Sequence, residues 1–377
     1  MENPFLTTGY KNPALFCDRE KELAELMQSV PGPSRVTLIA HRRMGKTGLI
    51  MRFFDELKQQ SVDVTTLYVD IFATRSLDDF IKALSETVLA TYPETTSFGH
   101  RFMNFIKTLR PVMSFDPITG TPEISINYQT ESEKTQTLRG ILEFLEKQDK
   151  PVILAIDEFQ QIREYPGQTM EAQLRTIIQH LHNVSFIFCG SKKHMMVDIF
   201  SNPGNPFYAS TAFMFLDPIA EESYKEFIAR KFAEAGRTIT PEAVEFILKW
   251  TRRHTYYTQS LAHAVFNLGH KETDVGEVRE ACASILKANE GLYFQYREML
   301  TSAQWNFLIA VACENEVTQI TAAEFLVKYK IGSASTSRRI LRSLLDKELL
   351  VENTGLRSTS YTLYDVFLLR WLETTYR

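Results

Sequence analysis

The feature that most constrains the fold of this chain is Gly45-Lys46-Thr47, which lies between an apolar run and an amphipathic segment. The run from Val36 to Ile39 is short, apolar and rich in β-branched residues, so it predicts a buried strand. After the tripeptide, apolar residues recur at helical spacing from Leu49 to Leu57. Strand, loop and helix in this order are the context in which Gly-Lys-Thr ends a phosphate-binding loop, so a nucleotide is the first ligand to expect.

In such a loop, backbone N–H groups and the N-terminus of the following helix surround the phosphates. The Lys46 ammonium would neutralise β- and γ-phosphate oxygens, and the Thr47 hydroxyl would bind Mg²⁺. Ala40 stands where loops of the form G-x-x-x-x-G-K-[ST] begin with glycine, and alanine can serve there if its φ is negative. The residues expected to bind the nucleotide here are Arg42, Arg43, Met44, Gly45, Lys46, Thr47 and Gly48.

A second apolar run ends in two carboxylates. Residues from Val152 to Ile156 are continuously apolar, as expected of a central parallel strand that is buried on both faces. Asp157 and Glu158 follow directly. Asp157 can hold Mg²⁺, directly or through water, while Glu158 can orient and deprotonate the water that attacks the γ-phosphate. Taken alone, the run would also suit a buried strand followed by a solvated acidic turn.

A third apolar run, Phe186 to Cys189, is followed by Gly190, Ser191 and Lys192. A polar side chain at the tip of a neighbouring strand could hydrogen-bond the γ-phosphate, and Ser191 is our candidate for this role in catalysis, with Lys192 second. The local sequence suits a turn with a helix N-cap at Ser191 equally well. Asp70 ends a further expected strand, but an aspartate there is more often a solvated cap, so we do not assign it to the site.

Composition indicates a soluble protein of two or three domains. The chain has 377 residues, of which 44% are hydrophobic, enough for several cores. Its net charge of −4 argues against binding polyanions over the whole surface but does not exclude a local basic face. The four cysteines lack C-x-x-C spacing, which favours reduced thiols over metal ligands. No apolar run reaches the roughly 18 residues that span a bilayer and no signal-peptide pattern is present, so we expect a cytoplasmic protein without membrane contact.

Three regions follow one another along the chain. Residues 1–217 alternate apolar runs with amphipathic segments, which predicts an α/β fold: a P-loop NTPase core with a parallel sheet covered on both faces. Turn signals from Phe115 to Tyr128 predict a small β-hairpin within it. Residues 218–300 have apolar residues at helical spacing and predict a helical lid domain. Residues 301–377 predict three helices and a β-wing that turns at Gly355, the pattern of a winged-helix domain.

The third expected helix of that domain, within residues 333–347, carries four basic residues and one acid. Arg338, Arg339 and Arg342 would project away from the apolar residues that bury against the domain, and an outward basic face suits contact with DNA. The whole segment 301–377 has nine Lys and Arg against eight Asp and Glu, and winged helices also bind proteins. DNA, a protein partner and self-association therefore all stay open.

Several short motifs occur in an order that resembles a known family. They are Phe16-Cys17-Asp18-Arg19-Glu20-Lys21-Glu22-Leu23, Arg42-Arg43-Met44-Gly45-Lys46-Thr47, Ile156-Asp157-Glu158-Phe159-Gln160, Gly190-Ser191, Leu216-Asp217-Pro218-Ile219 and Tyr364-Asp365-Val366-Phe367 with Arg370-Trp371. Over nearly its whole length the chain resembles the archaeal-type ATPases of the STAND class, P-loop relatives of AAA+ proteins. The resemblance implies an ATP-dependent switch, in which the nucleotide state changes how lid and winged helix pack on the core. It also implies that Phe16 and Arg19 help to enclose the adenine.

The chain departs from the family in the lid. The segment Arg252 to Tyr257 stands where the family tends to have a Gly-Gly-x-Pro-like motif. Arg252 or Arg253 could instead approach the phosphates, or both could be surface arginines of a lid helix.

Two functions from different classes fit these patterns. In the first, the protein is an ATPase that binds ATP or ADP with Mg²⁺: Lys46 and Thr47 hold phosphate and metal, Asp157 completes the metal site and Glu158 is the base. In the second, the chain is a nucleotide-locked module that acts by binding DNA or protein through the winged helix. The complete Lys-Thr and Asp-Glu pairs favour the first.

Overall fold

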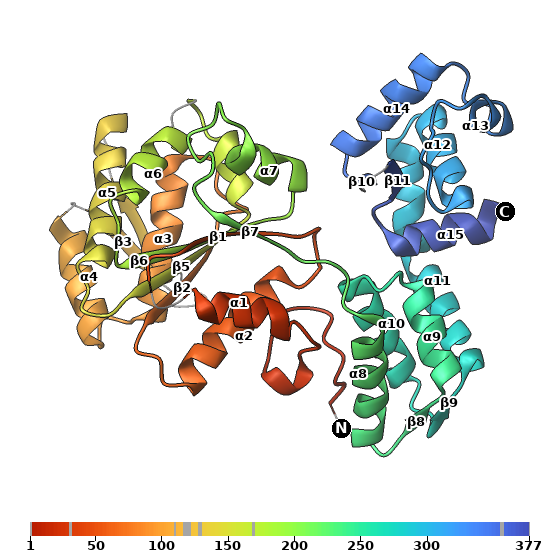
Figure 1. The fold of residues 1–377 in the computed structure, drawn as a ribbon, viewed down its shortest axis with the longest axis horizontal. Coiled ribbons are helices and arrows are strands. Elements are labelled where there is room, and N and C mark those ends of the chain that lie inside the picture. Colours follow the sequence, from red (N-terminus) through yellow and green to blue (C-terminus); the bar gives the residue numbers. More distant parts are fainter. Residues whose placement is uncertain are drawn as a thin grey trace. The chain divides into compact units, whose positions relative to one another are not determined.

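The computed structural model describes residues 2–29, 32–108, 111–115, 122–126, 130–167, 170–354 and 358–376. The chain forms two compact units, each visible in Figure 1. Gly9–Pro218 make one, which we call the core unit, and Met1–Thr8 with Ile219–Arg377 make the other, which we call the helical unit. The three domain boundaries expected from the sequence stay a prediction.

The core unit is built on a five-stranded parallel sheet, an α/β arrangement. From one edge to the other, the strands are β2 (Thr65–Asp70), β5 (Val152–Asp157), β6 (Val184–Gly190), β1 (Arg35–Ile39) and β7 (Ala212–Phe215). Every residue of β5 and β6 is buried, which explains the continuous apolar runs that these strands contain.

Helices cover both faces of this sheet (Figure 1). On one face, α1 (Glu20–Gln28) and α2 (Lys46–Gln59) pack their apolar residues against β1, β5 and β6. The helices that share the apolar core of the other face are α3 (Leu77–Thr91), α4 (Ser97–Thr108), α5 (Glu131–Glu146), α6 (Met170–Ile178) and α7 (Lys193–Ser201), together with the 3₁₀ helix η2 (Phe159–Glu164).

The strand order determines where polar residues gather. Because all five strands run in parallel, their carboxyl ends lie along one edge of the sheet, where ligands of such folds bind. The loop after β1, Asp157 at the end of β5 and Ser191 after β6 all reach this edge, and these three strands include the neighbouring pairs β5–β6 and β6–β1.

A small antiparallel hairpin accompanies the core unit. It pairs β3 (Pro111–Phe115) with β4 (Pro122–Ile126), in the region where the sequence predicts a hairpin. The turn signals at 116–121 and the residues 127–128 lie outside the described residues.

The lid part of the helical unit contains four helices: α8 (Glu221–Glu234), α9 (Pro241–Trp250), α10 (Thr255–Asn267) and α11 (Val275–Met299). Two short strands, β8 (Thr238–Ile239) and β9 (Glu272–Thr273), pair in parallel between them. Thr240 caps α9, and Asp274 with Glu277 forms a capping box at the start of α11.

The remainder of the helical unit is a winged helix, as predicted. It consists of α12 (Ser302–Glu314), α13 (Ala323–Lys328), α14 (Ala334–Asp346), the antiparallel wing strands β10 (Leu350–Thr354) and β11 (Thr359–Leu363), and the final helix α15 (Val366–Tyr376). The predicted turn at Gly355 lies outside the described residues. Helix α15 packs against both α11 and α12, and one apolar core joins lid and winged helix.

The first eight residues belong to the helical unit although the core unit follows them in sequence. Phe5 is almost completely buried there, with its ring packed against Phe227, Phe232 and Phe266. The backbone carbonyl of Phe5 is 2.8 Å from Nδ1 of His263. We call residues 2–8 the N-terminal strap.

None of the helices described is both long and apolar enough to cross a membrane.

Candidate functional site

The loop between β1 and α2 has the backbone of a phosphate-binding loop. Gly45 has φ of 95°, in the left-handed region that glycine tolerates best, and α2 begins at the next residue. Arg43 also has positive φ, whereas Ala40 does not. Ala40 therefore meets the condition stated in the sequence analysis, that φ at the first loop position is not positive. Alanine in place of glycine causes no backbone strain there.

Lys46 lies at the N-terminus of α2 and is only 6% exposed. Its ammonium is 3.7 Å from Oε1 of Glu158, a long ion pair for so buried a cation. Gly45, the residue that caps α2, has no side chain, and the first turn of the helix contains no acid. A buried cation beside an uncapped helix N-terminus fits a phosphate group.

The Asp157 carboxylate accepts hydrogen bonds on both oxygens. Its Oδ2 accepts from the hydroxyl of Thr47 at 3.0 Å and from the phenol of Tyr68 at 2.6 Å. Its Oδ1 accepts from the backbone N–H of Glu158 at 2.9 Å. Thr47 and Asp157, the two expected metal ligands, are thus in direct contact.

Glu158 is held by two neighbours. Its Oε2 accepts from the hydroxyl of Ser191 at 2.6 Å and from Nε2 of Gln160 at 2.5 Å. Glu158 itself has φ of 55°, so the backbone turns sharply where the strand ends. The N-cap position of the following helix α7 is Lys192, whose side chain makes no capping hydrogen bond, and the hydroxyl of Ser191 donates to the carboxylate instead.

Phe16 lies beside the start of α2, and Arg19 follows three residues later, directly before α1. A Cβ atom added to Gly48 would lie 3.2 Å from Cε2 of Phe16, so the ring packs directly on the glycine. Arg19 is buried, and its Nη1 is 2.8 Å from Oε1 of Glu22. Its buried Nη2 has no hydrogen-bond partner among the described residues. The Phe16 ring at the start of α2 suits contact with a heteroaromatic base, and the unsatisfied Nη2 of Arg19 is a buried donor that a polar ligand atom could accept from.

His41 and Asp70, two titratable groups at this edge, have shifted pKa values. Burial lowers the pKa of His41, and the positive charges of Lys193 and Lys46 lower it further. Burial raises the pKa of Asp70, and the charges of Asp157 and Glu158 add to the effect. Asp70 accepts a hydrogen bond from the backbone N–H of Phe72, so it does act as a cap, although its strand position pairs with that of Asp157.

Two residues at the site were not predicted from the sequence. Gln160 donates to Glu158, and Tyr68 donates to Asp157. Gln160 is two residues from the carboxylate that it contacts. Tyr68 is two residues before Asp70 in the same strand, so alternation places both on one face of the sheet. These two-residue spacings, Gln160 from Glu158 and Tyr68 from Asp70, were the sequence signal that could have identified both residues.

The described residues fit a nucleotide with Mg²⁺. The oxygen donors of Thr47 and Asp157 are of the kind that Mg²⁺ prefers, and the remaining ligands in such sites are phosphate oxygens and water. In the part of the chain that the structure describes, no group of three or more His, Cys, Asp and Glu residues is placed to hold a metal. A site completed by a nucleotide needs no such group.

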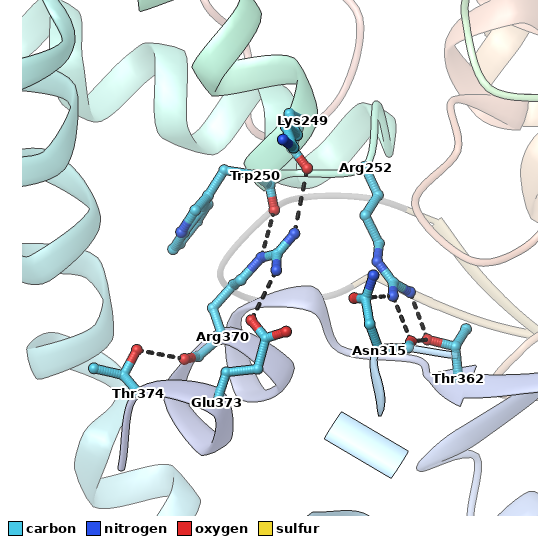
Figure 2. A network of polar contacts seen from close by, with 8 residues as sticks. All are labelled: Lys249, Trp250, Arg252, Asn315, Thr362, Arg370, Glu373 and Thr374. Carbon is cyan, nitrogen blue, oxygen red and sulfur yellow. Dashed lines mark hydrogen bonds and ion pairs between the residues drawn. The ribbon is translucent and has the colours of Figure 1, made fainter. Parts of the chain in front are cut away.

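Arg252 is engaged within the helical unit. Figure 2 shows its guanidinium between the lid and the winged helix, where Nη1 donates to Oγ1 of Thr362 at 2.5 Å and Nη2 donates to the carbonyl of Asn315 at 2.5 Å. Nη2 also contacts Oδ1 of Asn315. Arg253 is half-buried, and its Nη1 lies 3.4 Å from the carbonyl of Ile219. Arg252 therefore is not the solvated surface arginine that one interpretation of the sequence suggested.

Arg370 makes a second connection between the lid and the winged helix (Figure 2). From α15 it donates to the backbone carbonyls of Trp250 at 2.9 Å and Lys249 at 3.3 Å, while Glu373 pairs with its Nη1 at 2.7 Å. Arg370 and Trp371 belong to the last of the motifs noted in the sequence.

The basic residues of α14 lie on its outer face. Arg338, Arg339 and Arg342 are exposed, whereas Ile340, Leu341 and Leu344 are buried in the winged-helix core. The predicted separation of a basic face from an apolar face is present.

A parallel sheet that delivers a Gly-Lys-Thr loop and an aspartate to its carboxyl edge defines a P-loop ATPase core, here followed by a winged helix. Residues 16–254 match the family described as an ATPase domain predominantly from Archaea, and the chain belongs to this family. The protein is accordingly an ATPase. Residues 291–374 match a family described as a probable winged helix domain. No curated protein sequence matches the chain.

Solved structures share the fold at low identity. The Walker-type ATPase PABY2304 of Pyrococcus abyssi aligns with 98% of this chain and 99% of its own, at 18% identity and a TM-score of 0.67. The ORC2 protein of Aeropyrum pernix, solved with ADPNP and ADP, aligns with 99% of this chain and 96% of its own, at 14% identity and a TM-score of 0.58. The ORC1 protein of Aeropyrum pernix, solved in complex with DNA, aligns with 96% of this chain and 94% of its own, at 14% identity and a TM-score of 0.51.

Proposed function

We propose that the protein is an ATP-hydrolysing switch of the STAND type, in which the nucleotide state of the core is coupled to the winged helix. The observation that carries this proposal is the contact of Thr47 with Asp157 and of Lys46 with Glu158, at the carboxyl edge of one sheet. Family membership supports ATP hydrolysis, whereas the switch is inferred from the chain's own contacts.

Each residue has a role that follows from its position. The Lys46 ammonium and the backbone N–H groups at the start of α2 bind the phosphates, and Phe16 with Arg19 lines the adenine side. Thr47 and Asp157 would hold Mg²⁺, which neutralises charge on the phosphate oxygens. Glu158 accepts the proton of the attacking water, and Ser191 orients its carboxylate.

The base is restrained in this structure. Glu158 Oε2 accepts two hydrogen bonds, and its other oxygen faces Lys46, so the carboxylate has few acceptor sites left for water. Phosphate binding would draw Lys46 away from Glu158, because a phosphate carries more negative charge than a carboxylate. We infer that ATP binding itself releases the base.

The lid and the winged helix form the output body. Arg252 and Arg370 bridge them with hydrogen bonds at two places, and a shared apolar core lies beside these bridges. A change at the lid would therefore move the winged helix with it.

The first test is steady-state ATP hydrolysis by the wild type, Lys46→Ala and Glu158→Gln. We expect Lys46→Ala to lose nucleotide binding, and Glu158→Gln to bind ATP normally with turnover reduced about 10²-fold or more. Unchanged turnover in Glu158→Gln would contradict the role of the base. Binding of ATP by the wild type without turnover would favour the nucleotide-locked module.

We propose DNA binding through α14 as a second function. It is favoured by the exposed arginines Arg338, Arg339 and Arg342, and it would explain an output body that ends in a winged helix. In fluorescence anisotropy with duplex DNA, a variant with all three changed to alanine should bind at least tenfold more weakly, with a shallower dependence on salt. A matched control changes three exposed basic residues of the lid, namely Arg230, Lys271 and Lys287. Equal loss in both variants, or no binding by the wild type, would argue for a protein partner or self-association instead.

A further inference from the structure

Tyr68, on β2, contacts Asp157, the expected metal ligand at the end of the neighbouring strand β5. In the register of β2 and β5, Tyr68 lies opposite Ala155 and Asp70 lies opposite Asp157. Tyr68 and Asp157 are therefore diagonal neighbours on one face, a separation that an aromatic side chain can span. Because Ala155 is small, the ring has room to lean along the sheet and place its hydroxyl 2.6 Å from Oδ2 of Asp157.

The same carboxylate oxygen serves two hydroxyl groups. Oδ2 of Asp157 accepts from Tyr68 and from Thr47, whose Oγ1 is also 3.4 Å from the phenol oxygen. The three oxygens form one cluster at the start of α2. With Oδ1 occupied by the N–H of Glu158, three of the roughly four acceptor sites of the carboxylate are used by the protein. The orientation of Asp157 is thus fixed from three directions.

The phenol remains a donor at neutral pH. A tyrosine phenol ordinarily has a pKa of about 10, so it is protonated at neutral pH and can donate to the Asp157 carboxylate. A protonated phenol next to a carboxylate gives a charge-assisted hydrogen bond, which is shorter and stronger than a neutral one.

We propose that Tyr68 is a positioning residue for the metal site, a role that rests on the proposed function of this edge as a Mg²⁺-nucleotide site. Tyr68 holds Oδ2 of Asp157 against the hydroxyl of Thr47, so that both oxygen donors are arranged before Mg²⁺ arrives. With most of its acceptor capacity used by the protein, the Asp157 carboxylate would hold Mg²⁺ in one orientation only. Hydrogen-bonded partners that orient metal-site carboxylates in this way commonly change metal affinity when they are removed.

If the role of Tyr68 were purely structural, removing its hydroxyl would not change the response to Mg²⁺. Tyr165, in the same core unit, provides a matched control. Tyr165 is buried, whereas Tyr68 is half-buried, and the Tyr165 hydroxyl is 2.5 Å from Oγ1 of Thr74, with no metal-site carboxylate in that hydrogen bond. Tyr68→Phe deletes the phenol contacts with Asp157 and Thr47, and Tyr165→Phe deletes the phenol contact with Thr74, in the same unit. Only the first should alter the response to Mg²⁺.

The experiment uses the full chain and a fluorescent, non-hydrolysable ATP analogue, so that no turnover is needed. Analogue affinity is measured in EDTA and across a Mg²⁺ titration. We expect Tyr68→Phe to bind within twofold of the wild type in EDTA but to need about tenfold more Mg²⁺ for half of the metal-dependent gain in affinity. Tyr165→Phe should need the wild-type concentration. The same Mg²⁺ requirement in Tyr68→Phe and wild type, or a lower one in Tyr68→Phe, would overturn the proposal.

A double-mutant cycle with Asp157→Ala tests whether Tyr68 acts through the carboxylate. We expect Tyr68→Phe to add no further change once Asp157 is alanine, and an additive tenfold effect would overturn the proposal. Failure of the proposed function would look different, because the wild type would then bind no analogue under any condition. Analogue binding by the wild type with no response to Mg²⁺ would overturn the role of Tyr68 while leaving the nucleotide site in place.

Discussion

The hydroxyl of Ser191 lies 2.6 Å from Oε2 of Glu158, although the two residues follow different strands of the sheet. The contact joins the ends of β5 and β6, which pair along their length. Ser191 can therefore affect catalysis by orienting the carboxylate, whether or not it also touches a phosphate.

Replacing Ser191 with alanine removes this donor while Gln160 still holds the same oxygen. We predict that Ser191→Ala lowers kcat about tenfold and changes the affinity for ATP less than twofold, because the base is misoriented only during the chemical step. The measurement is steady-state hydrolysis together with ATP binding. Ser185, a buried serine of β6, the strand that Ser191 follows, provides the control, since Ser185→Ala should leave kcat unchanged. A change in affinity alone would indicate that Ser191 contacts the nucleotide rather than the base.

Adding one methyl group at Gly48 should have opposite effects on helix stability and on ATP binding. A Cβ there would lie 3.2 Å from Phe16, so the ring must move by a few tenths of an ångström. We predict that Gly48→Ala weakens ATP binding about fivefold, or roughly 1 kcal/mol, while alanine raises helix stability by about 0.5–1 kcal/mol. Analogue titration and thermal melting measure the two effects. If Phe16 carries the effect, Gly48→Ala will not weaken binding further in a Phe16→Ala background.

Replacing Arg252 with glycine tests how much the bridge between lid and winged helix contributes to stability. Because its φ is 55°, glycine fits the backbone, and Arg252→Gly deletes the guanidinium without adding strain. We predict a loss of about 1–3 kcal/mol in the free energy of unfolding of the helical unit, because the hydrogen bonds to Asn315 and Thr362 disappear. Arg253→Gly is the control, since Arg253 has φ of 56° and its guanidinium makes one long hydrogen bond within the described residues, to the carbonyl of Ile219.

Tryptophan fluorescence makes this measurement selective. The three tryptophans of the chain, Trp250, Trp305 and Trp371, all lie in the helical unit. Urea unfolding followed by their emission therefore reports that unit. Equal midpoints for Arg252→Gly and Arg253→Gly would show that the bridge adds no stability.

His41 should make the nucleotide-free protein sensitive to acid. Its pKa is lowered in the folded state by burial and by Lys193 and Lys46, so the unfolded chain binds a proton at a higher pH than the folded one. The folded state loses stability as pH falls below the ordinary histidine value of 6.5. We predict that His41→Asn is less destabilised than the wild type between pH 7.5 and 5.5, which urea unfolding at both pH values measures. Parallel losses would mean that His41 does not titrate in this window.

The sequence could predict those elements in which local pattern and tertiary structure agree. The runs at Val36 and Val152 are buried strands, and the Gly45 loop begins a helix with phosphate-binding geometry. In these segments burial on both sides requires apolar residues, and the sharp turn requires glycine, so the pattern is visible without knowledge of the rest of the chain.

Contacts between distant residues left no such pattern. Phe5 is a single aromatic residue in a segment without periodicity, yet three phenylalanines of the helical unit surround it. Arg252 stands in a left-handed backbone position where glycine would be expected, and its hydrogen bonds to Asn315 and Thr362 come from far along the chain. Pattern recognition captures periodic burial, but it does not identify which surface a lone side chain will meet.

The N-terminal strap has a consequence for biosynthesis. Residues 2–8 are synthesised before the core unit, but the phenylalanines that enclose Phe5 are encoded after the entire core unit. At translation rates of about 5–20 residues per second, the chain between the strap and these phenylalanines takes on the order of ten seconds or longer to synthesise. Until translation has passed Phe266, Phe5 lacks at least one of the three aromatic partners that bury it in the folded helical unit.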